Sequence, residues 1–181
     1  MWIVFILGSG VLVALDLWLK AWAYDYLQNN PPQVLISGLV GLRYVENTGM
    51  VFGFLSGHEW TVWVSSIAKA IVMIMLLVYY HKLPTGKKFL LLRIPLIFVF
   101  AGAVGNLYDR LTMGAVRDML EFLFMNFAIF NLADVFIVTG AISWGVFELF
   151  IVKYHISEES EGLVDETAEE AEECEEPEES E

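Results

Sequence analysis

The sequence has almost no cysteine and few charged residues over most of its length. Its single cysteine, Cys174, excludes a disulfide scaffold. Of the 23 acidic residues, 14 lie in residues 157–181, a segment without Lys or Arg, so residues 1–156 hold 9 acidic and 10 basic residues. No basic stripe is present, and we therefore expect no nucleic-acid partner. The acidic segment has too little apolar content to fold and is predicted to be a disordered tail.

Apolar residues make up 57% of the chain, which is more than a soluble domain normally contains. Four stretches reach the roughly 20 apolar residues that a membrane-spanning helix requires. We therefore predict an all-α membrane domain over residues 1–156, with spans at about 2–24, 60–80, 89–108 and 128–152.

The basic residues of the connecting segments predict the orientation of these spans. The 81–93 connection carries four Lys or Arg and Lys153 follows the last span, against three basic residues in the two opposite connections. Both termini are therefore expected in the cytoplasm. Residues 2–15 could instead form a signal-peptide core, but no basic residue precedes it, and Asp16 and Lys20 interrupt it before a cleavage site.

Ionisable and amide side chains lie inside or at the ends of three spans, where their burial is costly. With cytoplasmic termini, all of them are expected toward the outer face of the membrane. This gathering makes each a functional candidate: Asp16, Lys20, Asn106, Asp109, Arg110, Asp118, Asn131 and Asp134. Lys69, inside the second span, is instead predicted to extend along the helix toward the interface.

The spacing of these residues leaves structural and catalytic interpretations open. Asp16 and Lys20 share a helix face and favour a structural ion pair. Asn131 and Asp134 have the spacing of a helix-capping box. Asp118 and Asp134 near one interface also suggest paired-carboxylate chemistry, in which two close acids share one proton. The 16-residue separation does not by itself decide between these interpretations.

A transporter, a non-catalytic assembly subunit and other classes of enzyme would each require a different pattern of polar residues. A transporter with a proton relay needs acids distributed through the membrane depth, and a non-catalytic assembly subunit needs acids that only cap helices. The three histidines are expected on both sides of the membrane, so neither a metal cluster nor a Ser-His arrangement is predicted. No metal or organic cofactor is implied.

Five short motifs in this order resemble lipoprotein signal peptidase, the type II signal peptidase of bacteria. The similarity covers about residues 10–150, nearly the whole membrane domain. The matching stretches are Asp16-Leu-Trp-Leu-Lys20, Asn47-Thr-Gly-Met-Val-Phe-Gly53, Gly102-Ala-Val-Gly-Asn106-Leu-Tyr-Asp-Arg110, Gly114-Ala-Val-Arg-Asp118 and Phe130-Asn-Leu-Ala-Asp134.

The resemblance implies a fold of four transmembrane helices with a small extracytoplasmic β-like cradle, supplied by residues 30–57. It implies an aspartic endopeptidase that removes the signal peptide from diacylglyceryl-prolipoproteins, on the amino side of the lipid-modified cysteine. The family's catalytic aspartates fall on Asp118 and Asp134. Its supporting residues fall on Asp16, Lys20, Asn47, Gly49, Asn106, Arg110 and Asn131.

The resemblance also implies a bacterial cytoplasmic membrane, an active site near its outer face, and contacts with membrane lipid; a monomer is expected. Asp109 and Glu121 lie outside the catalytic pair, and we expect their amide variants to be milder. The sequence departs from the family at Met50-Val51, where small residues are usual, and at Arg117, where valine is frequent. Both departures concern the shape of the substrate pocket and not the reaction.

Overall fold

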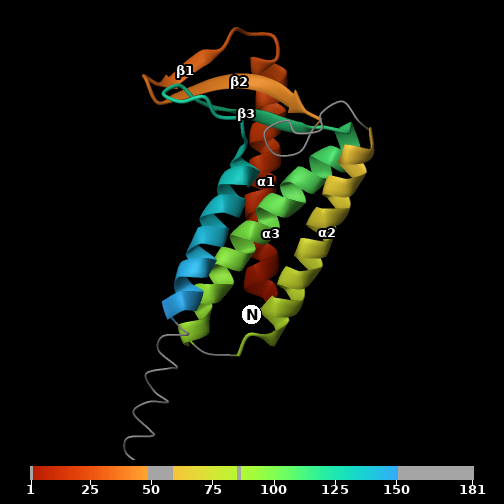
Figure 1. The fold of residues 1–181 in the computed structure, drawn as a ribbon, viewed down its shortest axis with the longest axis vertical. Coiled ribbons are helices and arrows are strands. Elements are labelled where there is room, and N and C mark those ends of the chain that lie inside the picture. Colours follow the sequence, from red (N-terminus) through yellow and green to blue (C-terminus); the bar gives the residue numbers. More distant parts are fainter. Residues whose placement is uncertain (1, 49–58, 85–86, 151–181) are drawn as a thin grey trace, which may run out of the picture. The chain divides into compact units, whose positions relative to one another are not determined.

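The computed structural model describes residues 2–48, 59–84 and 87–150, and the chain divides into two units, 1–144 and 145–181 (Figure 1). The described residues contain four helices that are long and apolar enough to cross a membrane. Three of them are α1 (Trp2–Leu27), α2 (Glu59–Lys82) and α3 (Lys87–Met113). The last is Leu132–Phe150, which runs across the boundary between the two units. The predicted tail, residues 157–181, and Gly49 lie outside the described residues.

The four predicted spans are found, with shifted ends. The third helix continues to Met113, and the last begins at Leu132 and not near residue 128. The later start has a local cause: Phe130 forms an antiparallel bridge with Leu120, which keeps the chain before Asn131 extended. The helix can begin only after this bridge.

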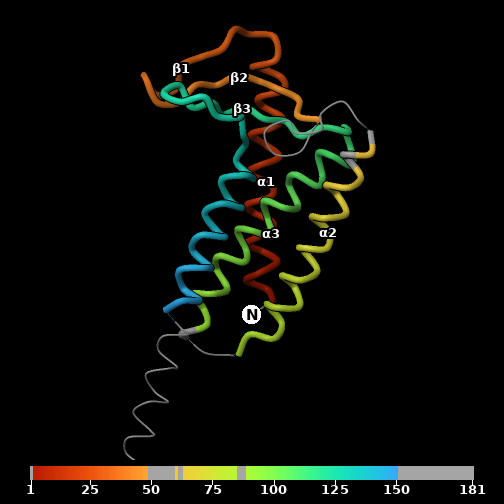
Figure 2. The backbone as a smooth tube through the Cα atoms, in the orientation of Figure 1, coloured from red at the N-terminus to blue at the C-terminus, as the bar shows by residue number. Residues whose placement is uncertain are grey.

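Helix α3 is the centre of the helical layer. In α3, more than half of the most apolar segment is buried, whereas in each of the other three helices less than a quarter of that segment is buried. Helix α3 packs against both α1 and α2, as the backbone tube shows (Figure 2). Two glycines allow the closest approaches. A Cβ at Gly102 would collide with the carbonyl oxygen of Ala133, and one at Gly105 with the carboxylate of Asp16. Small residues at these positions therefore bring three helices together at the level of the polar side chains.

A three-stranded antiparallel sheet lies at one end of the helices (Figure 1). Its order is β1 (Gln33–Ile36), β2 (Val40–Asn47) and β3 (Val116–Phe122). The described part of the expected cradle, residues 30–48, supplies two strands, β1 and β2. The third comes from the 109–127 connection, which the sequence placed in a loop, because β3 finds its partner in a strand far away along the chain.

The pairing of β2 with β3 fixes the position of Asp118. Asp118 is opposite Val45, and the register shifts between Leu42 and Val45. The sheet is anchored on the end of α1 through a small apolar cluster of Ala23, Leu27 and Met119, all buried. Because Met119 follows Asp118 in β3, this cluster fixes the strand next to the candidate acid.

Candidate active site

The polar residues singled out in the sequence come together where α1, α3, β2, β3 and the start of the Leu132–Phe150 helix meet. Most of them are almost fully buried, while Asn47 and Asp134 are half-buried. The structure brings together every described candidate of the predicted site: Asp16, Lys20, Asn47, Asn106, Arg110, Asp118, Asn131 and Asp134.

Two asparagine amides connect the two candidate acids. The Nδ2 of Asn131 donates to Asp118 Oδ1 at 2.6 Å and to Asn106 Oδ1 at 3.1 Å. The Nδ2 of Asn106 in turn donates to Asp134 Oδ1 at 2.8 Å. Asn47 donates to the other oxygen of Asp118 at 3.0 Å. Each carboxylate is therefore held by amide donors that also fix its distance from the other.

Asn131 and Asp134 form the capping box that their spacing predicted. The backbone N–H of Asn131 donates to Asp134 Oδ2 at 3.2 Å, and the backbone N–H of Asp134 donates to Asn131 Oδ1 at 3.0 Å. The same two side chains also contact Asn106 and Asp118 through their remaining atoms. Capping and site formation are thus compatible, because the cap uses Asn131 Oδ1 and Asp134 Oδ2 and leaves Asn131 Nδ2 and Asp134 Oδ1 for the site.

Lys20 is the buried cation behind the asparagines. Its ammonium lies 2.8 Å from Asp16 Oδ2, which confirms the predicted ion pair, and it donates to Asn106 Oδ1 at 2.9 Å. The second oxygen of Asp16 accepts the backbone N–H of Ala133 at 2.9 Å. An acid near the first N–H groups of a helix also interacts favourably with the helix dipole. The pair therefore ties α1 both to α3 and to the start of the helix that carries Asp134.

Asp109 has a larger part in the site than the sequence indicated. Its side chain is fully buried, 3.4 Å from the ammonium of Lys20 and 2.6 Å from Arg117 Nη2. Asp109 was among the polar candidates expected at the outer face, and the milder effect expected of its amide variant stays a prediction. Glu121, the other acid outside the catalytic pair, lies 3.7 Å from the exposed Arg43. Arg117 lies inside an otherwise apolar stretch, and this was the one sequence signal for its contact with Asp109.

Burial dominates the electrostatics of Asp118. Burial and, next, the nearby charge of Asp134 raise the pKa of Asp118 to about 7, while the hydrogen bonds of Asn47 and Asn131 act in the opposite direction. The buried guanidinium of Arg110 interacts with the charges of both acids. At neutral pH, Asp118 therefore holds a proton for a large fraction of the time.

Lys69 faces the same group of charges. It is half-buried on α2, and its charge interacts with those of Arg110 and Asp134. The prediction that Lys69 extends along its helix toward the interface stays a prediction. The sequence could not indicate the interaction with Arg110 and Asp134, because the surroundings of a lysine on a span depend on which helix packs beside it.

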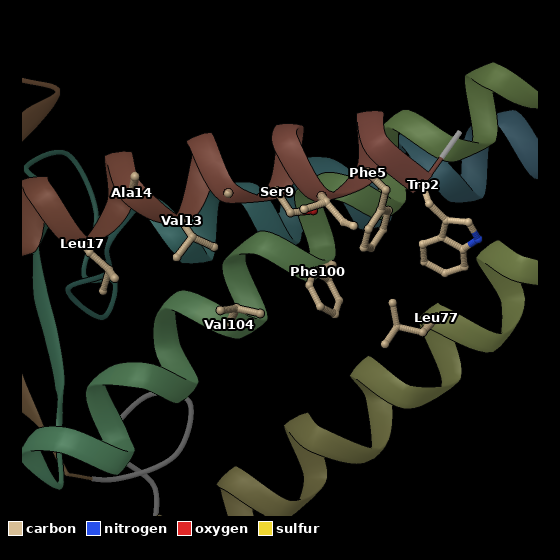
Figure 3. Close-up of a pocket in the computed structure, with 11 residues that line it drawn as sticks. Trp2, Phe5, Ser9, Val13, Ala14, Leu17, Leu77, Phe100 and Val104 are labelled. Atoms are coloured by element: carbon tan, nitrogen blue, oxygen red, sulfur yellow. The ribbon is translucent and has the colours of Figure 1, made fainter.

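A separate groove between α1, α2 and α3 is apolar (Figure 3). Its volume is about 580 Å³, and its lining includes Trp2, Phe5, Leu77 and Phe100. None of its lining residues belongs to the polar site, and it offers no acid or base for hydrolysis. The groove therefore adds no candidate for acid–base chemistry to the polar residues described above.

The fold and the site define a multi-pass membrane protein with a pair of coupled carboxylates at one end of its helices. The family model described as "Signal peptidase (SPase) II" matches residues 9–150. The chain belongs to the signal peptidase II family and is therefore a protease.

Relatives and solved structures agree with this assignment. The chain is 36% identical to the lipoprotein signal peptidase of Enterococcus faecalis, over 77% of this chain and 84% of that protein. It is 34% identical to that of Clostridioides difficile, over 77% and 90%. Two solved bacterial membrane enzymes have TM-scores of 0.72 and 0.65 at 26% and 25% identity. The first covers 80% of this chain and 87% of the solved chain, and the second 78% and 90%.

Proposed function

We propose that this chain is an aspartic endopeptidase that removes the signal peptide from lipid-modified prolipoproteins, on the amino side of the modified cysteine. The observation that carries the proposal is the connection of Asp118 to Asp134 through Asn131 and Asn106. Two acids held in this way can share one proton, which is what general acid–base hydrolysis of a peptide bond needs.

We assign the acid to Asp118 and the base to Asp134. Asp118 is almost fully buried, and its pKa of about 7 lets it hold the proton before reaction. Asp134 is half-buried, accepts N–H groups on both oxygens, and interacts with the positive charge of Arg110. Asp134 is then the carboxylate that accepts the proton of the attacking water.

The reaction then balances with one shared proton. Asp134 takes a proton from water while the oxygen of that water attacks the scissile carbonyl carbon, and Asp118 gives its proton to the carbonyl oxygen. Collapse of the tetrahedral diol breaks the C–N bond, and the proton on Asp134 goes to the leaving amine. The hydroxyl proton of the diol returns to Asp118, so both acids regain their starting states.

The supporting residues act on the two acids. Asn131 and Asn106 fix their separation, and Asn47 holds the second oxygen of Asp118. Arg110 balances their charge, and Lys20 with Asp16 holds α1 against the site. The proposal assigns Gly49, which lies outside the described residues, to the same supporting set.

The site suits a substrate that is itself embedded in lipid. The polar residues lie at the sheet-bearing end of the helices, where water can reach a peptide bond held at the membrane surface. We infer a bacterial cytoplasmic membrane with both termini in the cytoplasm and the site near the outer face, as the basic residues of the connections favour. We expect a monomer in contact with membrane lipid.

Amide variants of the two acids test the proposal. Asp118→Asn and Asp134→Asn should each abolish cleavage of a lipidated precursor peptide, scored by the mass of the product, at normal membrane abundance. The loss should exceed the roughly 10²–10⁴-fold effect of one acid–base group, because the two acids act as a unit. The double variant should be hardly slower than either single one.

The capping interpretation gives the opposite result at one position. Asn can replace Asp in a helix cap, so a purely structural Asp134 predicts nearly full activity for Asp134→Asn. Glu121→Gln, on the same strand as Asp118, is the matched control and should retain activity. Near-full cleavage by either dyad variant would remove the aspartic mechanism.

A further inference from the structure

Asp118 lies between two backbone N–H groups that are held from outside the sheet. The N–H of Met119 donates to the carbonyl oxygen of Phe130 at 2.9 Å. On the other side, the N–H of Arg117 donates to Asp109 Oδ2 at 3.1 Å. Because both neighbours are held, the Asp109 carboxylate forms one of two supports for the backbone that carries the candidate acid.

The side chain of Arg117 fixes the same carboxylate. Its Nη2 lies 2.6 Å from Asp109 Oδ1, and its Nε donates to Asp109 Oδ2 at 3.3 Å. Two donors of a planar guanidinium hold both oxygens, which sets the plane of the carboxylate as well as its position. In this plane, Oδ2 faces the N–H of Arg117. The contact is buried, with side-chain exposures of 11% for Arg117 and 0% for Asp109.

Asp109 also has a competing partner. The ammonium of Lys20 lies 3.4 Å from Asp109 Oδ2. An ammonium is a point charge that accepts many carboxylate orientations, whereas a guanidinium fork accepts few. Without the fork, the Asp109 carboxylate is free to turn toward Lys20 and to release the N–H next to Asp118.

We propose that Arg117 is a positioning residue of the peptidase reaction, which fixes the Asp109 carboxylate so that this carboxylate holds the strand segment of Asp118. The inference rests on the proposed function, because it assumes that Asp118 takes part in catalysis. Successive side chains of a strand point to opposite faces, so Arg117 acts from behind the acid without contact with substrate.

A double-mutant cycle on the full-length protein in detergent tests this role. The variants are Arg117→Met, Asp109→Asn and the double variant, each assayed for kcat, KM and thermal unfolding with a lipidated precursor peptide. We expect Arg117→Met to lower kcat by about 10–100-fold with KM within about twofold, because a small displacement of a reacting group lowers turnover more than binding.

The double variant separates positioning from simple charge neutralisation. It also removes the buried charge that Arg117 balances at position 109, so it should regain part of the thermal stability that Arg117→Met loses. The proposal expects its kcat to remain as low as that of the slower single variant, since both changes break the same support. Recovery of wild-type kcat in the double variant would show that Arg117 only neutralises Asp109, and multiplied losses would show independent effects; either result overturns the proposal.

Two further variants complete the design. Arg117→Lys keeps the charge but not the fork, so it should restore less than a tenth of wild-type kcat; full turnover would refute the role of the fork. Arg43→Met is the matched control, because Arg43 is an exposed arginine of the same sheet, and it should leave kcat unchanged. If the wild-type protein fails to cleave, the proposed function fails; if wild type and Arg117→Met cleave equally, only this inference fails.

Discussion

The raised pKa of Asp118 predicts how cleavage depends on pH. Burial and the charge of Asp134 raise this pKa from 3.8 to about 7. If Asp118 is the proton donor, kcat/KM should fall as the pH rises through about 7, by roughly tenfold for each further pH unit. Because the acids interact, the fitted value belongs to the pair and not to one residue.

The same shift predicts the sign of a stability effect. The folded chain binds this proton more tightly than the unfolded chain, so the stabilising contribution is complete below pH 3.8 and is lost as the pH rises through about 7. A rise of about 3 in the pKa of Asp118 corresponds to about 4 kcal/mol in the free energy of unfolding, at about 1.36 kcal/mol for each pH unit. Asp118→Asn cannot ionise and should therefore be more stable than wild type at pH 8, by at most about 4 kcal/mol, with little difference near pH 4.

Two measurements on the same samples check this reasoning. Cleavage of the lipidated peptide gives kcat/KM from about pH 5 to about pH 9, a range that includes the expected fall above about pH 7. Thermal unfolding in detergent gives the stability of wild type, Asp118→Asn and the control Glu121→Gln. A flat kcat/KM up to pH 9, together with no gain in stability for Asp118→Asn at pH 8, would refute the argument from burial.

Three further outcomes are expected. Arg110→Lys should lower kcat by at least about tenfold although the charge is kept, because an ammonium cannot hold two acceptors in a fixed geometry; wild-type kinetics would make Arg110 an interfacial anchor. Truncation after His155 should leave turnover within about twofold, since the acidic segment is predicted not to fold, and a large loss would contradict the predicted topology. Gly105→Ala should destabilise the protein by about 1–3 kcal/mol in thermal unfolding, because its methyl group meets Asp16. Gly10→Ala, where nothing lies within 4 Å, is the control, and an equal effect of both would contradict the packing argument.

The class of fold follows from the amino-acid sequence alone. Hydropathy and length are local properties, so the four spans follow from them within a few residues at their ends. The pairing of Asp16 with Lys20 and the Asn131–Asp134 cap are also local, because helix geometry brings residues three or four apart together. For this reason both contacts are found as the spacing predicts.

The assignment of the two acids required more than local pattern. The distance of Asp118 from Asp134 along the chain carries no structural meaning. Their expected position near one interface suggested paired-carboxylate chemistry, and the resemblance of five motifs favoured it over the structural interpretations. Their separation in space is set by Asn131 and Asn106, which come from different elements. A chain of side-chain hydrogen bonds through two helices and a strand cannot be read from one sequence.

The residues that surround the two acids can be identified only in the folded chain. Strand β3 exists because β2, from an earlier connection, pairs with it, and this pairing turns an expected loop into the support of Asp118. The contact of Arg117 with Asp109 depends on the same packing. Strand pairing and helix packing join residues at large sequence separation, and the directions of long charged side chains follow from them, so these features emerge only when the chain is folded.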